Sequence, residues 1–439
     1  MNYNDAIEYI QSLSGLGSRP GTDAISGLLA RLGDPQNRLQ VIHIAGTNGK
    51  GSVFTFLAEM LKSAGYVTGR YISPAIFTYL EKYQIDGEYM TENEFCDIME
   101  EIIPICDEMV NDGLERPTAF ETETAAAFLY FYKKDVDVLL LETGMGGEGD
   151  ATNVVERPLC TVLASISRDH MQVLGDKLTD ILEEKMGIMR PGVPCVSYEL
   201  NPELKSIWLG KCEELNCKGV MLDKSQITIE KQTMYGTDIT FKGENYHISM
   251  PGTFQIYNAA LAIMTAQMID KISDSDIDLK NEDIKCGLSR AIWPGRFQLL
   301  KENDSHIPVI IDGSHNEEGW LGLKENISYY LSDYQLIFVC GVLADKEYDR
   351  MIEILAPHSD ILIALTPDNP RALSGVDLIH AAADSFAQTY VAGDAVSGLN
   401  MALEIGQHMK NPAVLVFGSL SFIGDIIKTS EEWQNGQDK

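Results

Sequence analysis

A glycine-rich segment at residues 41–61, VIHIAGTNGKGSVFTFLAEML, has the residue types that bind the phosphates of a nucleotide. Glycines let backbone N–H groups approach phosphate oxygens, a helix N-terminus adds the positive end of its dipole, and a lysine adds a mobile charge for the β- and γ-phosphates. The segment departs from GxxxxGK[ST], because Ile44 replaces the first glycine and Gly51 separates the lysine from the serine. A turn that serves packing alone is the alternative. We predict nucleotide binding by Asn48, Gly49, Lys50, Gly51 and Ser52.

Side chains that suit a metal ion follow two further apolar runs. Glu142 ends the run at 136–142, and a carboxylate at the carboxyl end of a buried strand near a phosphate loop is where Mg²⁺ is usually held. The alternative is an acidic residue that meets only water. His170 follows the run at 159–166; a lone histidine more often has a structural role, and Mg²⁺ prefers oxygen ligands to imidazole. Lys185, between acidic residues, would ordinarily form a salt bridge on a helix surface.

Four polar residues further along the chain lie at the ends of predicted elements or at the Pro–Gly linker, and a structural or a binding role is open for each. Asn258 precedes an apolar helix-like stretch, where an asparagine at a helix start is the alternative. Arg296 follows Pro–Gly in WPGRFQ and suits bidentate phosphate binding. Asp312 and His315 follow the apolar run at 308–311, where a simple turn at a strand end is the alternative.

The elements that must position these residues alternate along the chain. In the first half, short apolar runs at 41–45, 136–141 and 159–166 alternate with amphipathic stretches, as buried parallel strands alternate with covering helices. Residues 219–250 alternate apolar and polar types, which predicts antiparallel strands with one exposed face. We predict an α/β fold with a P-loop, parallel-sheet N-terminal domain at 1–295, which carries a small antiparallel β appendage at 219–250. After the Pro–Gly linker, a smaller Rossmann-like α/β domain is predicted at 296–439.

The bulk composition limits the class of protein. The chain has 439 residues, of which 45% are hydrophobic and 23% charged, as in a globular protein of two domains. The net charge is -31, whereas a nucleic-acid binder normally presents a basic face, so no nucleic-acid partner is predicted. The chain has neither a membrane-length apolar run nor a signal-like start, which predicts a cytoplasmic protein without a membrane partner. Eight scattered cysteines without a CxxC pair predict free thiols.

Taken together, these motifs resemble the folylpolyglutamate synthase and dihydrofolate synthase branch of the Mur ligases. GTNGKGS is similar to the phosphate-loop signature of that branch, and LETGMGGEGDATN, SISRDHMQVLG, PGTFQIYNAALAI and VIIDGSHNEEG follow in the expected order over nearly the whole chain. The resemblance implies an N-terminal ATPase domain, a C-terminal glutamate-ligase domain and a monomer. It also implies an enzyme that uses ATP to join L-glutamate to a folate through an acyl phosphate. Whether dihydropteroate is a further acceptor, converted to dihydrofolate, stays open.

The resemblance also implies roles for individual residues. The implied catalytic residues are Lys50, Lys185 and His315. The implied nucleotide contacts are the loop residues together with Asn258, Arg296 and Asp312. Two implied Mg²⁺ sites take their ligands from Ser73, Glu142 and His170, and the implied substrate contacts are Thr118, Phe120 and Asp150. The lysine that matches Lys185 is carbamylated in the family, a modification that needs an uncharged amine.

Two departures from the family pattern leave an alternative function open. Ala75 stands where the family commonly has histidine, and Glu148 stands where it usually has a basic or polar residue. The alternative is a regulatory paralogue that binds ATP without catalysis. A cell-wall Mur ligase is not expected, because residues 1–40 leave no room for a UDP-sugar-binding domain before the phosphate segment. A GTPase is not expected either, since the chain has no NKxD-like segment.

Overall fold

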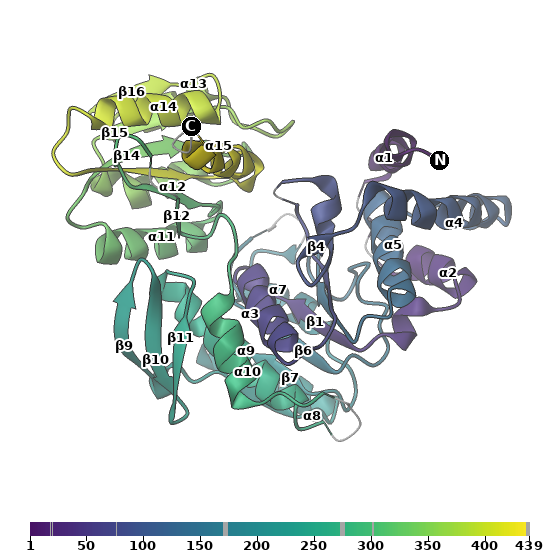
Figure 1. Ribbon diagram of the computed structural model, residues 1–439. Helices are drawn as coiled ribbons and strands as arrows, with labels where there is room; N and C mark the ends of the chain where they lie inside the picture. The colour runs from purple at the N-terminus through teal and green to yellow at the C-terminus, as the bar shows by residue number, and fades with distance from the viewer. Residues whose placement is uncertain are drawn as a thin grey trace. The chain divides into compact units, whose positions relative to one another are not determined.

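The chain folds into two compact units (Figure 1). The computed structural model describes residues 1–435 apart from 18, 20, 76, 170–173, 273–276 and 301–302. The first unit consists of Met1–Thr228, Thr240–Tyr246 and Tyr257–Ala291, and the second consists of Ile229–Ile239, His247–Ile256 and Ile292–Lys439. Within the described residues, no helix combines the length and the apolar character needed to span a membrane.

The first unit is built on an eight-stranded sheet with the order β4-β3-β2-β5-β1-β6-β7-β8. Its strands are β1 (Val41–Ala45), β2 (Thr68–Tyr71), β3 (Tyr83–Ile85), β4 (Glu88–Tyr89), β5 (Val138–Glu142), β6 (Cys160–Leu163), β7 (Cys195–Ser197) and β8 (Gly219–Met221). The strands from β2 to β8 in this order pair in parallel, and β3 and β4 pair antiparallel at one edge. Every residue of β1 and β5 is buried, as expected for parallel strands covered on both faces.

The helices of the first unit bury their apolar sides in its core. They are α1 (Tyr3–Ser12), α2 (Asp23–Arg31), α3 (Lys50–Ser63), α4 (Glu92–Asn111), α5 (Ala119–Lys133), α7 (Leu178–Met186), α8 (Pro202–Glu214) and α10 (Asn281–Arg290), and α9 (Thr253–Ile269) begins in the second unit and continues here. Residues of α1, α2, α4 and α5 share one apolar cluster that contains Ile10, Ile25, Met99 and Phe128. The helix of the phosphate loop, α3, packs closely on α10, because a Cβ on Gly287 would lie 2.4 Å from Met60 N.

A separate three-stranded sheet has the order β11-β10-β9. It consists of β9 (Ile227–Thr233), β10 (Gly236–Phe241) and β11 (Glu244–Ile248), and connections this short join antiparallel neighbours. Lys242 and Gly243 have φ angles of 50° and 81°, the positive values that a two-residue hairpin turn requires. Residues 219–221, predicted to belong to this appendage, instead form β8 and pair in parallel with β7. The alternating pattern alone did not distinguish a last strand of the large sheet from a first strand of the small one.

The second unit is built on a six-stranded sheet with the order β12-β13-β17-β14-β15-β16. Its strands are β12 (Gln298–Leu299), β13 (Val309–Asp312), β14 (Gln335–Cys340), β15 (Ile361–Ala364), β16 (Gln388–Val391) and β17 (Pro412–Phe417), and its helices are α11 (Glu317–Tyr330), α12 (Tyr348–Leu355), α13 (Gly375–Ala382), α14 (Ala395–Gly406) and α15 (Ile423–Asn435). All its strand pairs are parallel except β12 with β13. The α/β class predicted for both halves of the chain is thus confirmed.

Short 3-10 helices complete the connections. They lie at Leu13–Leu16, Pro35–Arg38, Tyr79–Lys82, Lys224–Gln226, Ala356–His358 and Leu420–Phe422.

Candidate active site

The predicted phosphate loop connects β1 to α3. Gly49 is the N-cap of α3 and has a left-handed φ of 84°, which favours glycine. Its Cα also lies against α9, because a Cβ there would be 2.6 Å from Asn258 Oδ1. The residues from Lys50 to Ser52 form the first turn of α3, and Ser52 is buried. The structure therefore brings Asn258 directly beside the loop residues that were predicted to bind the nucleotide.

The segment that follows β6 holds the loop in place. Thr47 N donates to Ser165 O at 2.7 Å, and Thr47 Oγ1 donates to Ser167 O at 3.0 Å. Asn48 N donates to Ser165 Oγ at 3.2 Å. The predicted metal motif SISRDH thus begins with two serines that fix the phosphate loop, a role that we did not predict for Ser165 or Ser167. The repeated serines gave no signal of it, because their partners lie more than a hundred residues earlier in the chain.

Lys50 and Glu142 meet at the carboxyl edge of the sheet. Lys50 Nζ donates to Gly46 O at 3.0 Å and to Thr47 O at 3.3 Å, so the lysine lies over its own loop. The same nitrogen lies 3.8 Å from Glu142 Oε1. Glu142 is the last residue of β5 and is in register with Ile44 of β1, which accounts for this proximity. The carboxylate is buried beside the loop, and the alternative in which it meets only water is wrong.

Lys185 reaches the same loop from α7. Its Nζ donates to Gly46 O at 2.9 Å, and the side chain is buried rather than exposed on a helix surface. Burial, and then the charge of Lys50, lower the pKa of Lys185 from an ordinary 10.5 to about 7, although three nearby carboxylates oppose the shift. Near neutral pH a large fraction of this amine is therefore uncharged, the state in which an amine is nucleophilic.

This pKa predicts how stability changes with pH. Above pH 7 the unfolded chain binds a proton at Lys185 that the folded chain has released, so the free energy of unfolding should rise with pH toward the ordinary lysine pKa. Between pH 7 and 9, the free energy of unfolding of the wild-type protein should rise relative to that of Lys185→Met by up to about 1.4 kcal/mol per pH unit. Urea denaturation in CO₂-free buffers measures this difference, and parallel curves for the two proteins would show that Lys185 keeps an ordinary pKa.

Two glycines, one in the LETGMGGEGDATN motif and one directly after α7, let α7 pack closely on that motif. A Cβ on Gly147 would lie 2.5 Å from Glu184 O, and a Cβ on Gly187 would lie 2.4 Å from Glu148 Cα. Glu148 N also donates to Glu184 O at 2.9 Å. These contacts join the motif to the last turn of α7, and that turn carries Lys185. The glycines are therefore required by packing, which sets the position of a functional side chain.

A cavity of about 490 Å³ opens beside this cluster within the first unit. Among its lining residues are the predicted metal ligand Ser73 and the predicted substrate contacts Thr118, Phe120 and Asp150. The Phe120 ring stacks on Tyr71, with ring centres 6.3 Å apart, and a Cβ on Gly144 would lie 2.6 Å from its Cζ. The cavity thus has an aromatic wall against which a flat ring can pack.

The polar groups of two of these residues shape the cavity. Thr118 is the N-cap of α5, and its N and Oγ1 both donate to Glu121 Oε2 at 2.8 Å. Asp150 accepts from Met145 N at 2.8 Å and from Thr152 N at 2.9 Å. Burial raises the pKa of the Asp150 carboxyl, and these hydrogen bonds oppose the shift. Both side chains therefore maintain the turns that line the cavity.

Sequence reasoning missed another wall of the cavity. Gly17, Arg19 and Gly21 line it, and Gly21 N donates to Gly149 O at 3.2 Å. The glycines around Arg19 indicated a loop after the first helix, but nothing local indicated that this loop returns to a motif more than a hundred residues later. Glu184 also lines the cavity and was not singled out.

The second unit brings its own predicted residues together. Asp312 ends β13 and accepts from Phe297 N at 2.9 Å and from Ser314 N at 2.8 Å. Gly313 N donates to Gly295 O at 2.7 Å, which joins the turn of Asp312 to the turn that carries Arg296. Burial raises the pKa of the Asp312 carboxyl, and the charge of Arg296 opposes this shift. His315 Nδ1 lies 2.9 Å from Gly313 O in the same turn.

The predicted metal ligands are partly placed. Glu142 lies beside the phosphate loop and Ser73 lines the cavity, whereas His170 lies outside the described residues. Within the part of the chain that is described, no three His, Cys, Asp or Glu side chains gather as a metal site. One buried carboxylate beside a phosphate loop still fits Mg²⁺, which keeps several waters and binds through one or two carboxylates together with substrate phosphates.

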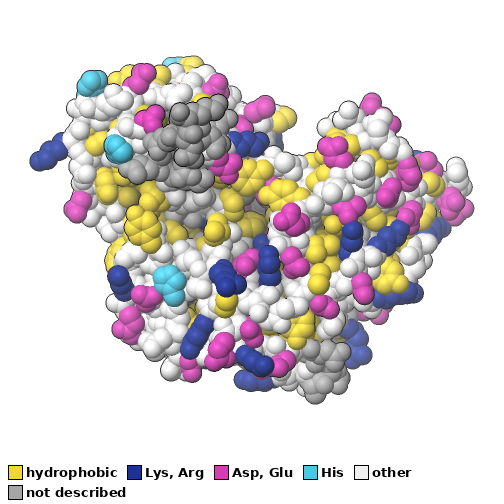
Figure 2. Space-filling model, in the orientation of Figure 1, with side chains coloured by type: hydrophobic (Ala, Val, Ile, Leu, Met, Phe, Trp, Pro, Cys, Tyr) yellow, Lys and Arg dark blue, Asp and Glu magenta, His cyan; other side chains and the backbone are white. Residues whose placement is uncertain are grey.

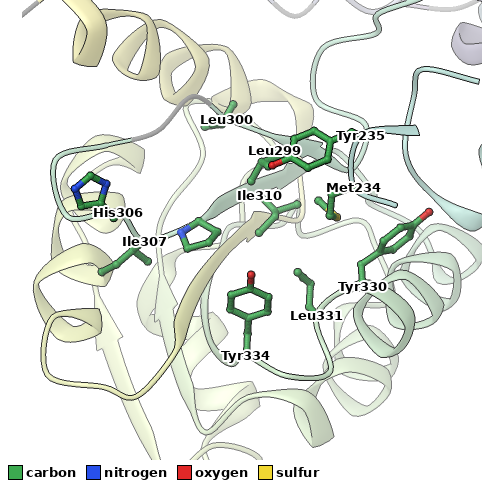
Figure 3. Close-up of a pocket in the computed structure, with 11 residues that line it drawn as sticks. Met234, Tyr235, Leu299, Leu300, His306, Ile307, Ile310, Tyr330, Leu331 and Tyr334 are labelled. Atoms are coloured by element: carbon green, nitrogen blue, oxygen red, sulfur yellow. The ribbon is translucent and has the colours of Figure 1, made fainter. Parts of the chain in front are cut away.

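A larger cavity of about 560 Å³ lies in the second unit (Figure 3). It is lined by Met234, Tyr235, Leu299, Leu300, His306, Ile307, Pro308, Ile310, Tyr330, Leu331 and Tyr334. In Figure 3 the Tyr334 hydroxyl points into this space, whereas the Tyr330 hydroxyl points away from it. The lining is mostly apolar and contains none of the predicted site residues, so cavity size alone does not identify the active site.

Charge on the visible face is mixed despite the net charge of -31. Figure 2 shows Asp and Glu side chains interspersed with Lys and Arg side chains among the described residues. Lys50 and Lys185 nevertheless place two basic side chains together at the predicted phosphate loop.

Comparisons with known proteins agree with this geometry. The Mur ligase middle domain matches residues 44–266, and the Mur ligase, glutamate ligase domain, matches residues 295–420. The chain is 35% identical over 433 residues to a dihydrofolate synthase/folylpolyglutamate synthase of Bacillus subtilis, which covers 97% of this chain and 98% of the relative. A folylpolyglutamate synthase structure from Thermotoga maritima superposes with a TM-score of 0.82 at 30% identity, over 99% of this chain and 97% of that one. A Mycobacterium tuberculosis folylpolyglutamate synthase complexed with ADP and AMPPCP gives 0.84 at 26% identity, over 98% and 99%.

Proposed function

The chain belongs to the Mur ligase family, in its folylpolyglutamate synthase and dihydrofolate synthase branch, and on this premise we propose that it joins L-glutamate to a folate at the expense of ATP. The observation that carries the proposal is the convergence of Lys50, Glu142 and Lys185 on one glycine-rich loop beside a cavity with an aromatic wall.

The proposed reaction proceeds in two steps. A carboxylate of the folate attacks the γ-phosphate of ATP, which releases ADP and forms an acyl phosphate. The amine of glutamate then attacks the acyl carbon, an amide forms and phosphate leaves. Phosphoryl transfer depends on alignment and charge neutralisation. In the first step, the backbone N–H groups of the loop and the Lys50 ammonium therefore provide most of the stabilisation of the phosphate charge. Bound Mg²⁺ would neutralise phosphate charge at Glu142.

The other predicted residues take proposed roles around this centre. Asn258 contacts the adenine beside Gly49, while Arg296, Asp312 and His315 serve the nucleotide from the turns of the second unit. Metal ligands are Ser73, Glu142 and His170, and acceptor contacts are Thr118, Phe120 and Asp150. The pKa of about 7 at Lys185 supports carbamylation of its uncharged amine.

Further features of the proposal concern the whole chain. We place the domain division at residues 295 and 296, where Gly295 has a φ of 75°. We propose a monomer in the cytoplasm, and the eight free thiols fit a reducing compartment.

A phosphate-release assay tests the proposed function. Wild-type protein with ATP and Mg²⁺ should release phosphate only when glutamate is present together with dihydropteroate or tetrahydrofolate. Phosphate release that is the same without glutamate, or no release with any acceptor while ATP still binds, would instead identify a non-catalytic ATP-binding paralogue. The departures from the family pattern at Ala75 and Glu148 are the reason for testing the non-catalytic alternative in this assay.

A further inference from the structure

One carboxylate that lines the cavity forms no hydrogen bond or ion pair with the described residues, although the charge of the neighbouring Lys185 acts on it. Glu121 accepts hydrogen bonds from Thr118, and Asp150 accepts them from the turn that follows β5. The Glu184 carboxylate lines the same cavity, yet it makes no side-chain hydrogen bond or ion pair with any residue that the structure describes. An ionised carboxylate without an ion-pair partner repels anionic ligands in the same cavity. The ligand proposed for this cavity is the acceptor, so Glu184 should weaken the binding of acceptors that carry more negative charge.

Glu148 places a second negative charge beside Glu184. The two backbones are held together by the hydrogen bond from Glu148 N to Glu184 O and by the close approach of Gly187 to Glu148 Cα. Burial, and then the charge of Glu148, raise the pKa of the Glu184 carboxyl, whereas the charge of Lys185 opposes this shift. Glu148 is exposed, so its charge acts on the acceptor from beside the cavity rather than from within it.

The last turn of α7 connects the cavity lining to the phosphate loop, because Glu184 is followed directly by Lys185. Glu184 lines the cavity, while its neighbour Lys185 bonds to Gly46 O of the loop. We infer that an acceptor bound in the cavity brings its reacting carboxylate past Glu184 on the way to the loop. Arg19 is the one cation among the described lining residues, and it is paired with Glu115 at 3.1 Å.

We propose that Glu184 and Glu148 select the acceptor by its charge, an inference that rests on the proposed function. A pteroate carries a single carboxylate, the one that reacts. In an acceptor that already carries glutamate, the α-carboxylate of the terminal γ-linked residue lies close to the reacting γ-carboxyl group, and this added charge is repelled by the two acids. The pair thus favours the pteroate acceptor and opposes extension of a glutamate tail, which makes Glu184 and Glu148 specificity-determining residues.

The test compares kcat/KM for dihydropteroate with kcat/KM for tetrahydrofolates that carry one and three glutamates. Glu184→Gln and Glu148→Gln should each raise one ratio, kcat/KM for the triglutamate acceptor divided by kcat/KM for dihydropteroate. The expected rise is about three- to tenfold, as for removal of one partly exposed like charge. Glu183→Gln is the matched control, because Glu183 is exposed on the same helix and does not line the cavity. Its ratio should stay at the wild-type value.

Three outcomes separate the possibilities. An unchanged ratio in both Glu184→Gln and Glu148→Gln overturns the selection by charge, and Glu148→Gln, a change at an exposed position, remains informative if Glu184→Gln folds poorly. A ratio that rises equally in Glu183→Gln also overturns it. If no acceptor supports phosphate release by the wild-type protein, the proposed function itself fails. Added salt screens partly exposed charges, so in the wild-type protein it should bring kcat/KM for the triglutamate acceptor closer to kcat/KM for dihydropteroate.

Discussion

Lys50→Ala is expected to lower acceptor-dependent phosphate release by roughly 10³-fold or more, the scale on which a lost cation acts in phosphoryl transfer. The Lys50 ammonium lies over the loop, bonded to the carbonyls of Gly46 and Thr47. Those bonds place it where the β- and γ-phosphates are proposed to lie. Steady-state assays at saturating ATP and folate measure the loss.

The fold should survive this substitution. Gly46 O keeps its hydrogen bond from Lys185, so the lost contacts should cost about 1 kcal/mol of unfolding free energy. Lys62→Ala is the matched control, since Lys62 lies on the same helix and donates to Asp86 O away from the loop. Full ligase activity in folded Lys50→Ala would refute the assignment of the phosphate loop.

Glu142→Gln is expected to reduce activity by roughly 10²- to 10³-fold and to raise the Mg²⁺ concentration needed for half-maximal rate. The substitution keeps the shape of a buried side chain but removes the negative charge that lies 3.8 Å from Lys50 Nζ. Titration of the rate against Mg²⁺ at fixed ATP separates a weakened metal site from a general loss of activity.

Glu59→Gln provides the comparison for this experiment. Glu59 lies on α3 and pairs with Arg70 at 3.1 Å, so its variant also removes one acid from an ion pair in the same unit. Its Mg²⁺ dependence should match that of the wild-type protein. An identical Mg²⁺ dependence in Glu142→Gln would instead remove Glu142 from the metal site.

The site residues that directly follow a visible apolar run could be predicted from the sequence. The loop at 46–52 and Glu142 lie at the ends of strands whose apolar runs are visible, and parallel strands bring their carboxyl ends to one edge. The buried strands of the second unit were visible for the same reason. Its edge strands, β12 and β16, have no such run, because β12 has two residues and β16 is largely exposed.

Long-range packing set the rest of the site. Lys185 resembled a surface lysine in its own segment, and its burial depends on a carbonyl at Gly46, 139 residues away. The wall formed by Gly17, Arg19 and Gly21 likewise depends on the bond from Gly21 N to Gly149 O. Neither contact has a local pattern, since residues that are polar or glycine in a loop are compatible with many tertiary partners.

The central claim is that the loop at 46–52 binds the triphosphate with Mg²⁺ at Glu142. A crystal structure of the protein with Mg²⁺ and AMPPCP tests this most directly. We predict density for the β- and γ-phosphates within hydrogen-bond distance of the loop N–H groups and Lys50 Nζ, with the metal bound by Glu142. A nucleotide located elsewhere, or an empty loop at a concentration of AMPPCP that saturates binding in solution, would contradict the account.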